Sequence, residues 1–566
     1  MLRVYHVTES RDPKAARIHT ASPSPRSDIT TMPLKTTPVV ERESGPAEKR
    51  AGRPLVREPT AILILVGALL VLQAIPAMLR PTEFLQDDSY FYLQIGRSIA
   101  EGHGSTFHGL APTNGYHPLW MAAVVAAAWT ADGGATATLH AVVAIQLVLA
   151  LATSLLFLKL ARDMCLDHGL LGLAVLLAYL LGTGVYGSEA HLNALTLTAG
   201  IVALWHSLGS RRAAVWFATG VLFGLAILAR LDNLFVAACL VGFGVLHDHE
   251  QRLGRVASRA VAAACGAALM LVPYLAYNAT HFGHLIPISG AIKSTFPSFQ
   301  LELDKLGTMG KLAACFGALS VMLGVVVDRN RRRRVLWLGL GTGTLVHSLY
   351  VAGYTQHYTF WAWYYVNGVI AAALAAAFLP SWLTARLTRG TFHTIARLLP
   401  IVAMFGVLLA GAARAQMKAF NPLQFGSVTI DWPINEYRWP EEFAGWMKEH
   451  LPMNSIVFTY DWPGALAYYS GLKILPMDGL VNDFRYNDDL LAVGATRYLC
   501  DRHVTLYFGL IDDDLKQQSL PVEAPLYRKP AGTLSLHRED ILVRIRDVVT
   551  RPDEALPFAV WRLRCD

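Results

Sequence analysis

The sequence predicts an α-helical polytopic membrane protein with a small α/β domain at its C-terminal end. Of its 566 residues, 53% are hydrophobic and 16% are charged, with a mean hydropathy of +0.36, whereas soluble domains carry about 25% charged residues. Apolar runs of nearly membrane-spanning length recur as far as residue 416, after which polar and apolar stretches alternate. These observations exclude a disordered chain and argue against most soluble enzymes.

The net charge of +7 does not indicate a nucleic-acid partner. Lys and Arg occur in short clusters between apolar runs rather than along one face, so we interpret them as signals of membrane topology. Residues 1–58 are rich in Pro, Ser, Thr and charge, and they lack the apolar core of a signal peptide. We expect them to form a disordered cytoplasmic tail.

Residues 59–416 are predicted to form the transmembrane module. A membrane-crossing helix needs about 20 mostly apolar residues, and this criterion indicates about eleven spans, of which the fifth and sixth are short. The predicted spans are 60–79, 137–159, 169–186, 191–208, 213–229, 233–246, 260–278, 310–327, 335–352, 366–384 and 396–416.

Whether the apolar stretch 118–129 crosses the membrane determines on which side of the membrane every later loop lies. If this stretch does not cross the membrane, one side receives most of the Lys and Arg of the loops, including the run 331–334. The positive-inside rule places that side and the N-terminus in the cytoplasm. The membrane is expected to be the cell membrane (inner or plasma). We therefore expect 118–129 to lie at the outer interface, inside a first external loop of about 80–136.

Residues 417–566 are expected to form an extracytoplasmic α/β domain. Of the six cysteines, Cys500 and Cys565 fall in this domain, where either a disulfide or two free thiols is compatible with the sequence. The alternation of elements favours a small parallel sheet. The predicted helices are 440–451, 464–469 and 488–502, and the predicted strands are 455–460, 473–476 and 504–509.

Two adjacent carboxylates, Asp87 and Asp88, begin the first external loop. An ionised Asp can take a proton from a hydroxyl, so the pair is suited to general-base catalysis. The alternative is that they only favour the start of the following helix.

Other polar residues are predicted to gather on the same external side. Glu189 is a second acidic candidate, and an Arg or Lys there could hold a phosphate. A structural ion pair between Arg230 and Asp232, and a membrane-interface role for the aromatic residues, remain open alternatives. The candidate residues for binding phosphate and substrate are Arg230, Asp232, Lys293, Tyr116, His117 and Tyr364.

The order of these motifs resembles the C superfamily of membrane glycosyltransferases (GT-C). Asp87-Asp88 lead an aromatic stretch in the first external loop, and the HPLW segment at 117–120 is similar to the His/Lys-Pro-Pro-Leu motif of that superfamily, with Leu119 in place of the second Pro. The segments ARLD (229–232), FGHLIPISGAIKS, WAWYYV and PMDGLVND are similar to bacterial members. Protein O-mannosyltransferases, aminoarabinose transferases and arabinofuranosyltransferases belong to this superfamily.

The resemblance implies an inverting glycosyltransferase of the cell envelope that acts on the periplasmic side. It would move a hexosyl or pentosyl group from a polyprenyl-phosphate donor to an acceptor hydroxyl on a glycan, lipid or protein. Asp87 or Asp88 would be the base, and Glu189 would position the acceptor or a metal. A divalent cation, Mg²⁺ or Mn²⁺, is left open, and no metal signature is present. A transporter or flippase of lipid-linked sugars and an envelope glycan-binding assembly protein are the alternatives.

Overall fold

The computed structural model describes residues 60–565 with internal gaps. The predicted tail 1–58 lies outside the described residues. The gaps are residues 183, 248–252, 357–360, 387–390, 421–422, 426–427, 431–438, 512–516, 524–529 and 550–557.

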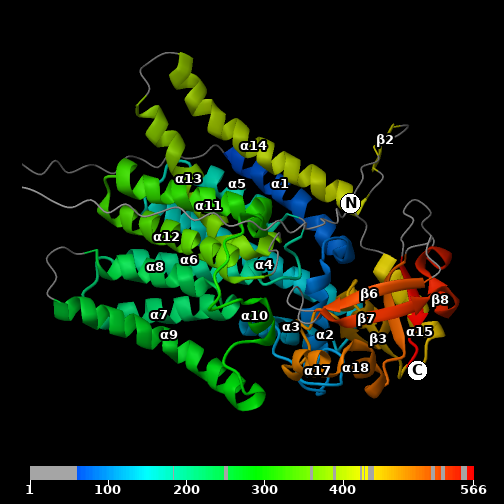
Figure 1. Ribbon diagram of the computed structural model, residues 1–566. Helices are drawn as coiled ribbons and strands as arrows, with labels where there is room; N and C mark the ends of the chain where they lie inside the picture. Colours follow the sequence, from blue (N-terminus) through cyan, green and yellow to red (C-terminus); the bar gives the residue numbers. More distant parts are fainter. Residues whose placement is uncertain are drawn as a thin grey trace, which may run out of the picture. The chain divides into compact units, whose positions relative to one another are not determined.

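Each apolar stretch that was predicted to span the membrane forms a helix. These helices run alongside one another (Figure 1). They are α1 (Thr60–Leu79), α4 (Ala135–Asp163), α5 (Gly169–Leu180), α6 (Ala190–Ser207), α7 (Ala213–Ala229), α8 (Asn233–Val245), α9 (Leu253–Phe282), α11 (Gly307–Met322), α12 (Arg331–Tyr354), α13 (Val366–Thr384) and α14 (Thr391–Ala419).

The chain is a multi-pass membrane protein. Within the described residues, six helical segments are long and apolar enough to cross a bilayer, while α5, α7 and α8 are shorter, so eleven spans stay a prediction. On α4, Val148, Leu151 and Leu155 are each more than 60% exposed, as expected for side chains that face lipid. The six segments are Ala135–Asp163, Leu253–Phe282, Leu303–Val327, Arg331–Tyr354, Ala362–Thr384 and Leu398–Ala419.

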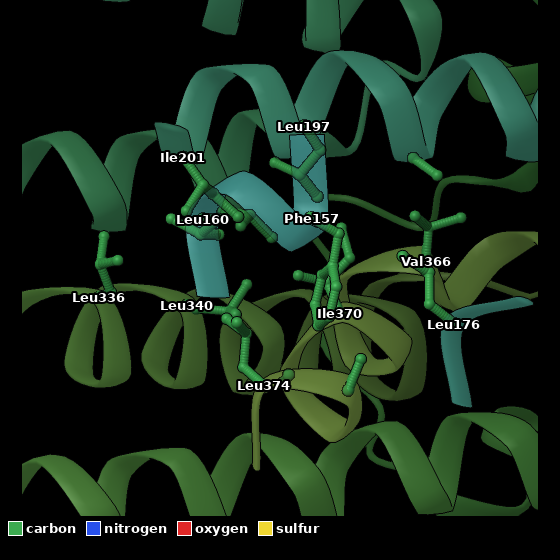
Figure 2. Packing of buried hydrophobic residues seen from close by; sticks show 14 of the residues in the cluster. Phe157, Leu160, Leu176, Leu197, Ile201, Leu336, Leu340, Val366, Ile370 and Leu374 are labelled. Carbon is green, nitrogen blue, oxygen red and sulfur yellow. The ribbon is translucent and has the colours of Figure 1, made fainter. Parts of the chain in front are cut away.

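Large aliphatic side chains fill the interior between the helices. Figure 2 shows this core, in which α4, α5, α6, α12 and α13 each contribute buried residues. Glycines allow the closest helix contacts: a Cβ at Gly220 of α7 would lie 2.0 Å from the Ala263 carbonyl oxygen of α9. The labelled core residues are Phe157, Leu160, Leu176, Leu197, Ile201, Leu336, Leu340, Val366, Ile370 and Leu374.

The loop predicted to be the first external one contains two helices, α2 (Asp87–Ala100) and α3 (Pro118–Thr130). With 13 residues, α3 is about 20 Å long, which is too short to cross a hydrocarbon core of about 30 Å. Because α5 and α8 are no longer than α3, this length does not distinguish α3 from the predicted spans, and the assignment of 118–129 to the outer interface stays a prediction. Side chains of α2, α3 and the intervening loop share one hydrophobic core with the C-terminal region, including Phe91, Ile95, Phe107, Met121, Phe443, Leu466 and Phe508.

The C-terminal sheet is mixed rather than parallel. Its strand order is β4-β3-β5-β9-β8, in which β3 is parallel to both neighbours and β9 is antiparallel to both of its own. The prediction of a parallel sheet is therefore correct only for β4, β3 and β5. These five strands are β3 (Ile456–Thr459), β4 (Lys473–Pro476), β5 (Leu506–Leu510), β8 (Ile541–Arg544) and β9 (Phe558–Arg562).

The helix predicted over 488–502 is two helices, because Gly494 adopts φ +82° between them. The C-terminal helices are α15 (Trp439–His450), α16 (Pro463–Ser470), α17 (Arg485–Val493) and α18 (Ala495–Asp501). Two further pairs of antiparallel strands are β1 (Leu423–Phe425) with β2 (Val428–Ile430) and β6 (Gln517–Glu523) with β7 (Pro530–His537). A short helix, α10 (Ile288–Lys293), and a π-helix, η3 (Leu323–Val327), lie in the membrane module. The 3₁₀ turns are η1 (Pro81–Glu83), η2 (Leu303–Leu306), η4 (Ala362–Tyr365), η5 (Arg538–Asp540) and η6 (Ile545–Asp547).

A disulfide joins Cys500, at the end of α18, to Cys565 beyond β9, whereas Cys165, Cys239, Cys265 and Cys315 are free. We expect denatured, unreduced protein to take up four maleimide-polyethylene glycol groups and reduced protein to take up six, measured as gel shifts. Equal uptake in both samples would contradict the disulfide.

Candidate active site

Loops from the two halves of the chain enclose a polar cavity. Seven of the nine predicted site residues line it, and Asp87 and Asp232 do not. The C-terminal domain adds Leu480 and Val481 to its wall. The seven are Asp88, Tyr116, His117, Glu189, Arg230, Lys293 and Tyr364.

Asp87 and Asp88 are the first two residues of α2, and their side chains have different neighbours. Consecutive residues of a helix point about 100° apart, so only Asp88 reaches the cavity. Asp87 instead accepts hydrogen bonds from the backbone N–H of Gly464 (3.1 Å) and Ala465 (2.8 Å), at the start of α16. A carboxylate is favourable at a helix N-terminus, where backbone N–H groups have no partner within the helix.

Gly464 permits this close contact. A Cβ at position 464 would lie 2.4 Å from the backbone oxygen of Asp87, so a larger residue would push α16 away from α2. Burial raises the pKa of Asp87 to about 7, although the two backbone hydrogen bonds act in the opposite direction. Asp87 therefore holds the C-terminal domain against the helix that carries Asp88.

Three charged residues at helix ends form a buried network beside the cavity. Glu189 precedes α6, Arg230 follows α7, and Asp232 precedes α8, so each charge suits the dipole of its own helix. Arg230 pairs with Glu189 and, at 2.9 Å, with Asp232. His347 contacts Asp232 at 3.1 Å. The structural ion pair left open in the sequence is therefore present.

Glu189 is held by a second donor in addition to Arg230. The Tyr92 hydroxyl donates to its Oε2 at 3.2 Å and accepts the His117 N–H at 3.3 Å. These bonds fix the orientation of the Glu189 carboxylate at the cavity wall.

Lys293, the last residue of α10, is the more available cation. Its ammonium donates to the Tyr364 hydroxyl at 2.9 Å, and within the described residues no carboxylate lies at ion-pair distance from it. Burial lowers the pKa of Lys293, but Tyr364 and Asp88 more than offset this effect, so the net shift is upward. The ammonium is therefore charged at neutral pH and faces the cavity.

The Tyr364 ring lies close to both cations. Arg230 lies 4.0 Å and Lys293 5.6 Å from its centroid. His117 adds no charge here, because burial lowers its pKa to about 4. The pKa of Asp88 is raised by burial, while Lys293 lowers it and Glu189 raises it.

Sequence reasoning missed Asp478, in the turn after β4. Burial raises its pKa to about 6, with Asp88 raising and Lys293 lowering it, which places its charge close to the cavity. Its Oδ1 accepts the Leu480 N–H at 3.0 Å. Asp478 lies in the segment PMDGLVND, which is similar to bacterial members of the superfamily, and an acid next to Gly in that segment was the available signal.

A separate apolar groove adjoins the cavity at Tyr116, which lines both. It lies between α3 and α9, and its wall combines small and aromatic side chains. The other residues that line it are Ile99, Pro118, Met121, Ala122, Val125, Tyr274, Tyr277 and Asn278.

The cavity residues do not form a ready metal site. Within the described part of the chain, no group of three His, Cys, Asp or Glu side chains is placed to hold an ion. Of the two cavity carboxylates, Glu189 is already bound by Arg230 and Tyr92. A divalent cation at this cavity therefore stays a prediction.

Removing the Asp87 carboxylate should loosen the C-terminal domain. We expect Asp87→Ala to lower the free energy of unfolding by about 2 kcal/mol, because two buried N–H groups lose their acceptor. Asp87→Asn, which keeps one acceptor oxygen, should have a smaller effect. Thermal unfolding of the purified protein measures both, and an unchanged melting temperature in Asp87→Ala would contradict this role.

The same contact should depend on pH. The folded protein binds the Asp87 proton more tightly than the unfolded chain, because the folded pKa is about 7 against an ordinary value of 3.8. The stability linked to this protonation is therefore fully present below about pH 4 and is lost as the pH rises through 7, while the two backbone N–H groups keep their acceptor. Asp87→Asn removes the titrating carboxyl and keeps Asp88 and Asp478, the charged groups that raise its pKa. We therefore expect the melting temperature of this variant to fall less steeply with rising pH than that of the wild type. Parallel slopes would contradict this expectation.

No family model and no curated protein matches this chain. Among solved structures, it is similar to ArnT from Cupriavidus metallidurans in the apo state, with a TM-score of 0.53 and 12% sequence identity. The match covers 84% of this chain and 97% of that chain, so it includes both the helices and the C-terminal region. At this identity, the likeness establishes the fold. The chain therefore shares the fold of that ArnT structure, and the superfamily that its motifs resemble stays a prediction.

Proposed function

We propose that this protein is an inverting glycosyltransferase that moves a sugar from a polyprenyl-phosphate donor to an acceptor hydroxyl outside the cytoplasm. The observation that carries the proposal is one cavity that joins a carboxylate, Asp88, to an available ammonium, Lys293, beside an apolar groove. A base, a cation for phosphate and a surface for an isoprenoid are the three features that this reaction needs.

Asp88 is the proposed base. Its carboxylate takes the proton of the acceptor hydroxyl, and the acceptor oxygen bonds to the anomeric carbon as the bond from that carbon to the phosphate oxygen breaks. The electron pair leaves with polyprenyl phosphate, and attack opposite the leaving group inverts the configuration. The raised pKa of Asp88 makes it a better base near neutral pH than an ordinary Asp.

Lys293 is the proposed phosphate ligand, with the Tyr364 hydroxyl beside it. A fixed cation stabilises the negative charge that develops on a leaving phosphate. Arg230 is less available for this contact, because Glu189 and Asp232 already hold its guanidinium. We assign Arg230 and Asp232 to positioning Glu189, and Glu189 to orienting the acceptor. No step is assigned to a divalent cation.

The groove between α3 and α9 is the proposed site of the first isoprenyl units. Its wall contains Met121, Val125 and Tyr277, and Tyr116 separates it from the polar cavity. A lipid lying there would present its phosphate towards Lys293. The acceptor would enter from the water on the external side, in the predicted orientation.

The function is tested by incubating the purified full-length protein with a panel of polyprenyl-phosphate hexoses and pentoses, together with envelope glycans, lipids and peptides. Mass spectrometry then detects released polyprenyl phosphate and the glycosylated acceptor. Release coupled to glycosylation supports the proposal. Movement of an intact donor across a vesicle membrane, with no new glycosidic bond, would contradict it and favour a flippase.

Neutralising Lys293 should weaken donor binding. We expect Lys293→Gln to raise the donor KM about tenfold to a hundredfold, because a charge-assisted contact contributes about 1.5–3 kcal/mol. Lys311→Gln is the matched control, since Lys311 is an exposed lysine that pairs with Asp304. An unchanged KM in Lys293→Gln, or an equal rise in both variants, would contradict this assignment.

A further inference from the structure

A second cavity lies at the opposite ends of the helices that frame the candidate active site. It is formed by the turn after α4, the end of η3, the beginning of α12 and the end of α13. The α13 residues that line the second cavity run from Ala377 to Trp382. Since α13 begins at Val366, two residues after Tyr364, they lie about 17–24 Å along the helix from the first cavity. This displacement is more than half the thickness of a bilayer core, about 30 Å, so the second cavity lies towards the other membrane face, predicted to be cytoplasmic.

A neutral ion pair forms one wall of this cavity. Arg333 bonds to Asp328 at 2.7 and 3.0 Å through two nitrogens and donates to the Met164 carbonyl at 3.0 Å. Trp337 donates to the same carboxylate at 3.0 Å. These bonds use the hydrogen-bonding capacity of Asp328, so the pair supplies a rigid wall and little net charge.

Two further arginines carry the charge of the cavity. Arg329 and Arg386 are exposed and line it, and neither has a carboxylate partner within the described residues. Arg386 stacks over the Trp382 ring at 4.6 Å, which holds its guanidinium at the rim. Asp167 also lines the cavity, so these three groups leave a net positive charge.

The remaining wall is apolar and continues onto the surface that faces lipid. Leu166, Val327 and Phe378 line the cavity. Beside it, Val326 is 75% exposed and Leu383 is 46% exposed. A ligand that binds both parts of the cavity needs an anionic head group to contact the arginines and hydrocarbon chains to contact the apolar wall.

We propose that this cavity binds the phosphate headgroup of an anionic phospholipid from the adjacent leaflet. Arg329 and Arg386 hold the phosphate oxygens, since the planar fork of arginine matches two oxygens at once. The acyl chains lie along Val326 and Leu383. Basic pockets between helix ends at a membrane face suit such headgroups, and this site is independent of the proposed transfer reaction.

Native mass spectrometry of the purified full-length protein tests the proposal with two probe lipids, dioleoylphosphatidylglycerol and dioleoylphosphatidylcholine. We expect tighter binding of phosphatidylglycerol, by about tenfold, because a basic residue near an anionic lipid contributes about 1 kcal/mol. Arg329→Gln with Arg386→Gln should remove this preference. Arg211→Gln with Arg212→Gln is the matched control, because these exposed arginines lie in another loop of the same predicted side.

Equal binding of the two lipids by the wild type would overturn the proposal, and so would an equal loss of preference in the control variant. Displacement of the lipid by excess inorganic phosphate would also overturn it, because it would indicate a site for free phosphate. Melting temperatures measured without lipid show whether each double variant is folded. If one is not, Arg386→Gln alone should remove about half of the preference on a logarithmic scale, and no change in this single variant would also overturn the proposal.

Discussion

The contact between Asp87 and the first turn of α16 is the constraint on which the candidate site depends. It joins two segments 377 positions apart and brings Leu480, Val481 and Asp478 to the helix that carries Asp88. Because Asp87 and Asp88 are consecutive, fixing the first carboxylate on α16 also fixes the direction of the second. The cavity is therefore closed by the C-terminal domain, and one turn of helix couples domain docking to the orientation of the proposed base.

The charges around the cavity follow a second constraint. An ionised group removed from water needs a partner, and Arg230 has two, Glu189 and Asp232. Lys293 has only a hydroxyl at hydrogen-bond distance within the described residues. Its ammonium can therefore receive an anionic ligand without breaking an ion pair, and this difference underlies the assignment of the donor phosphate to Lys293 rather than to Arg230.

Much of the fold could be predicted, because apolar runs and their lengths report burial directly. The boundary at Gly494 and the antiparallel strand β9 could not, since a positive φ and a long-range strand pairing leave weak local signals. Seven of the nine predicted site residues line one cavity, but their different surroundings could not be predicted. Which of Asp87 and Asp88 faces the cavity depends on Gly464 and Ala465, far along the chain, and Asp478 comes close to Asp88 only in the folded protein.

Asp88 is the proposed base, and Asp87 positions it. The most direct measurement compares initial rates of polyprenyl-phosphate release by Asp87→Asn and Asp88→Asn, with both proteins shown to be folded. A missing general base lowers a rate by about 10²–10⁴-fold, so Asp88→Asn should lose that much activity while Asp87→Asn stays within about tenfold of the wild type. The reverse order, or equal losses in both variants, would contradict the account.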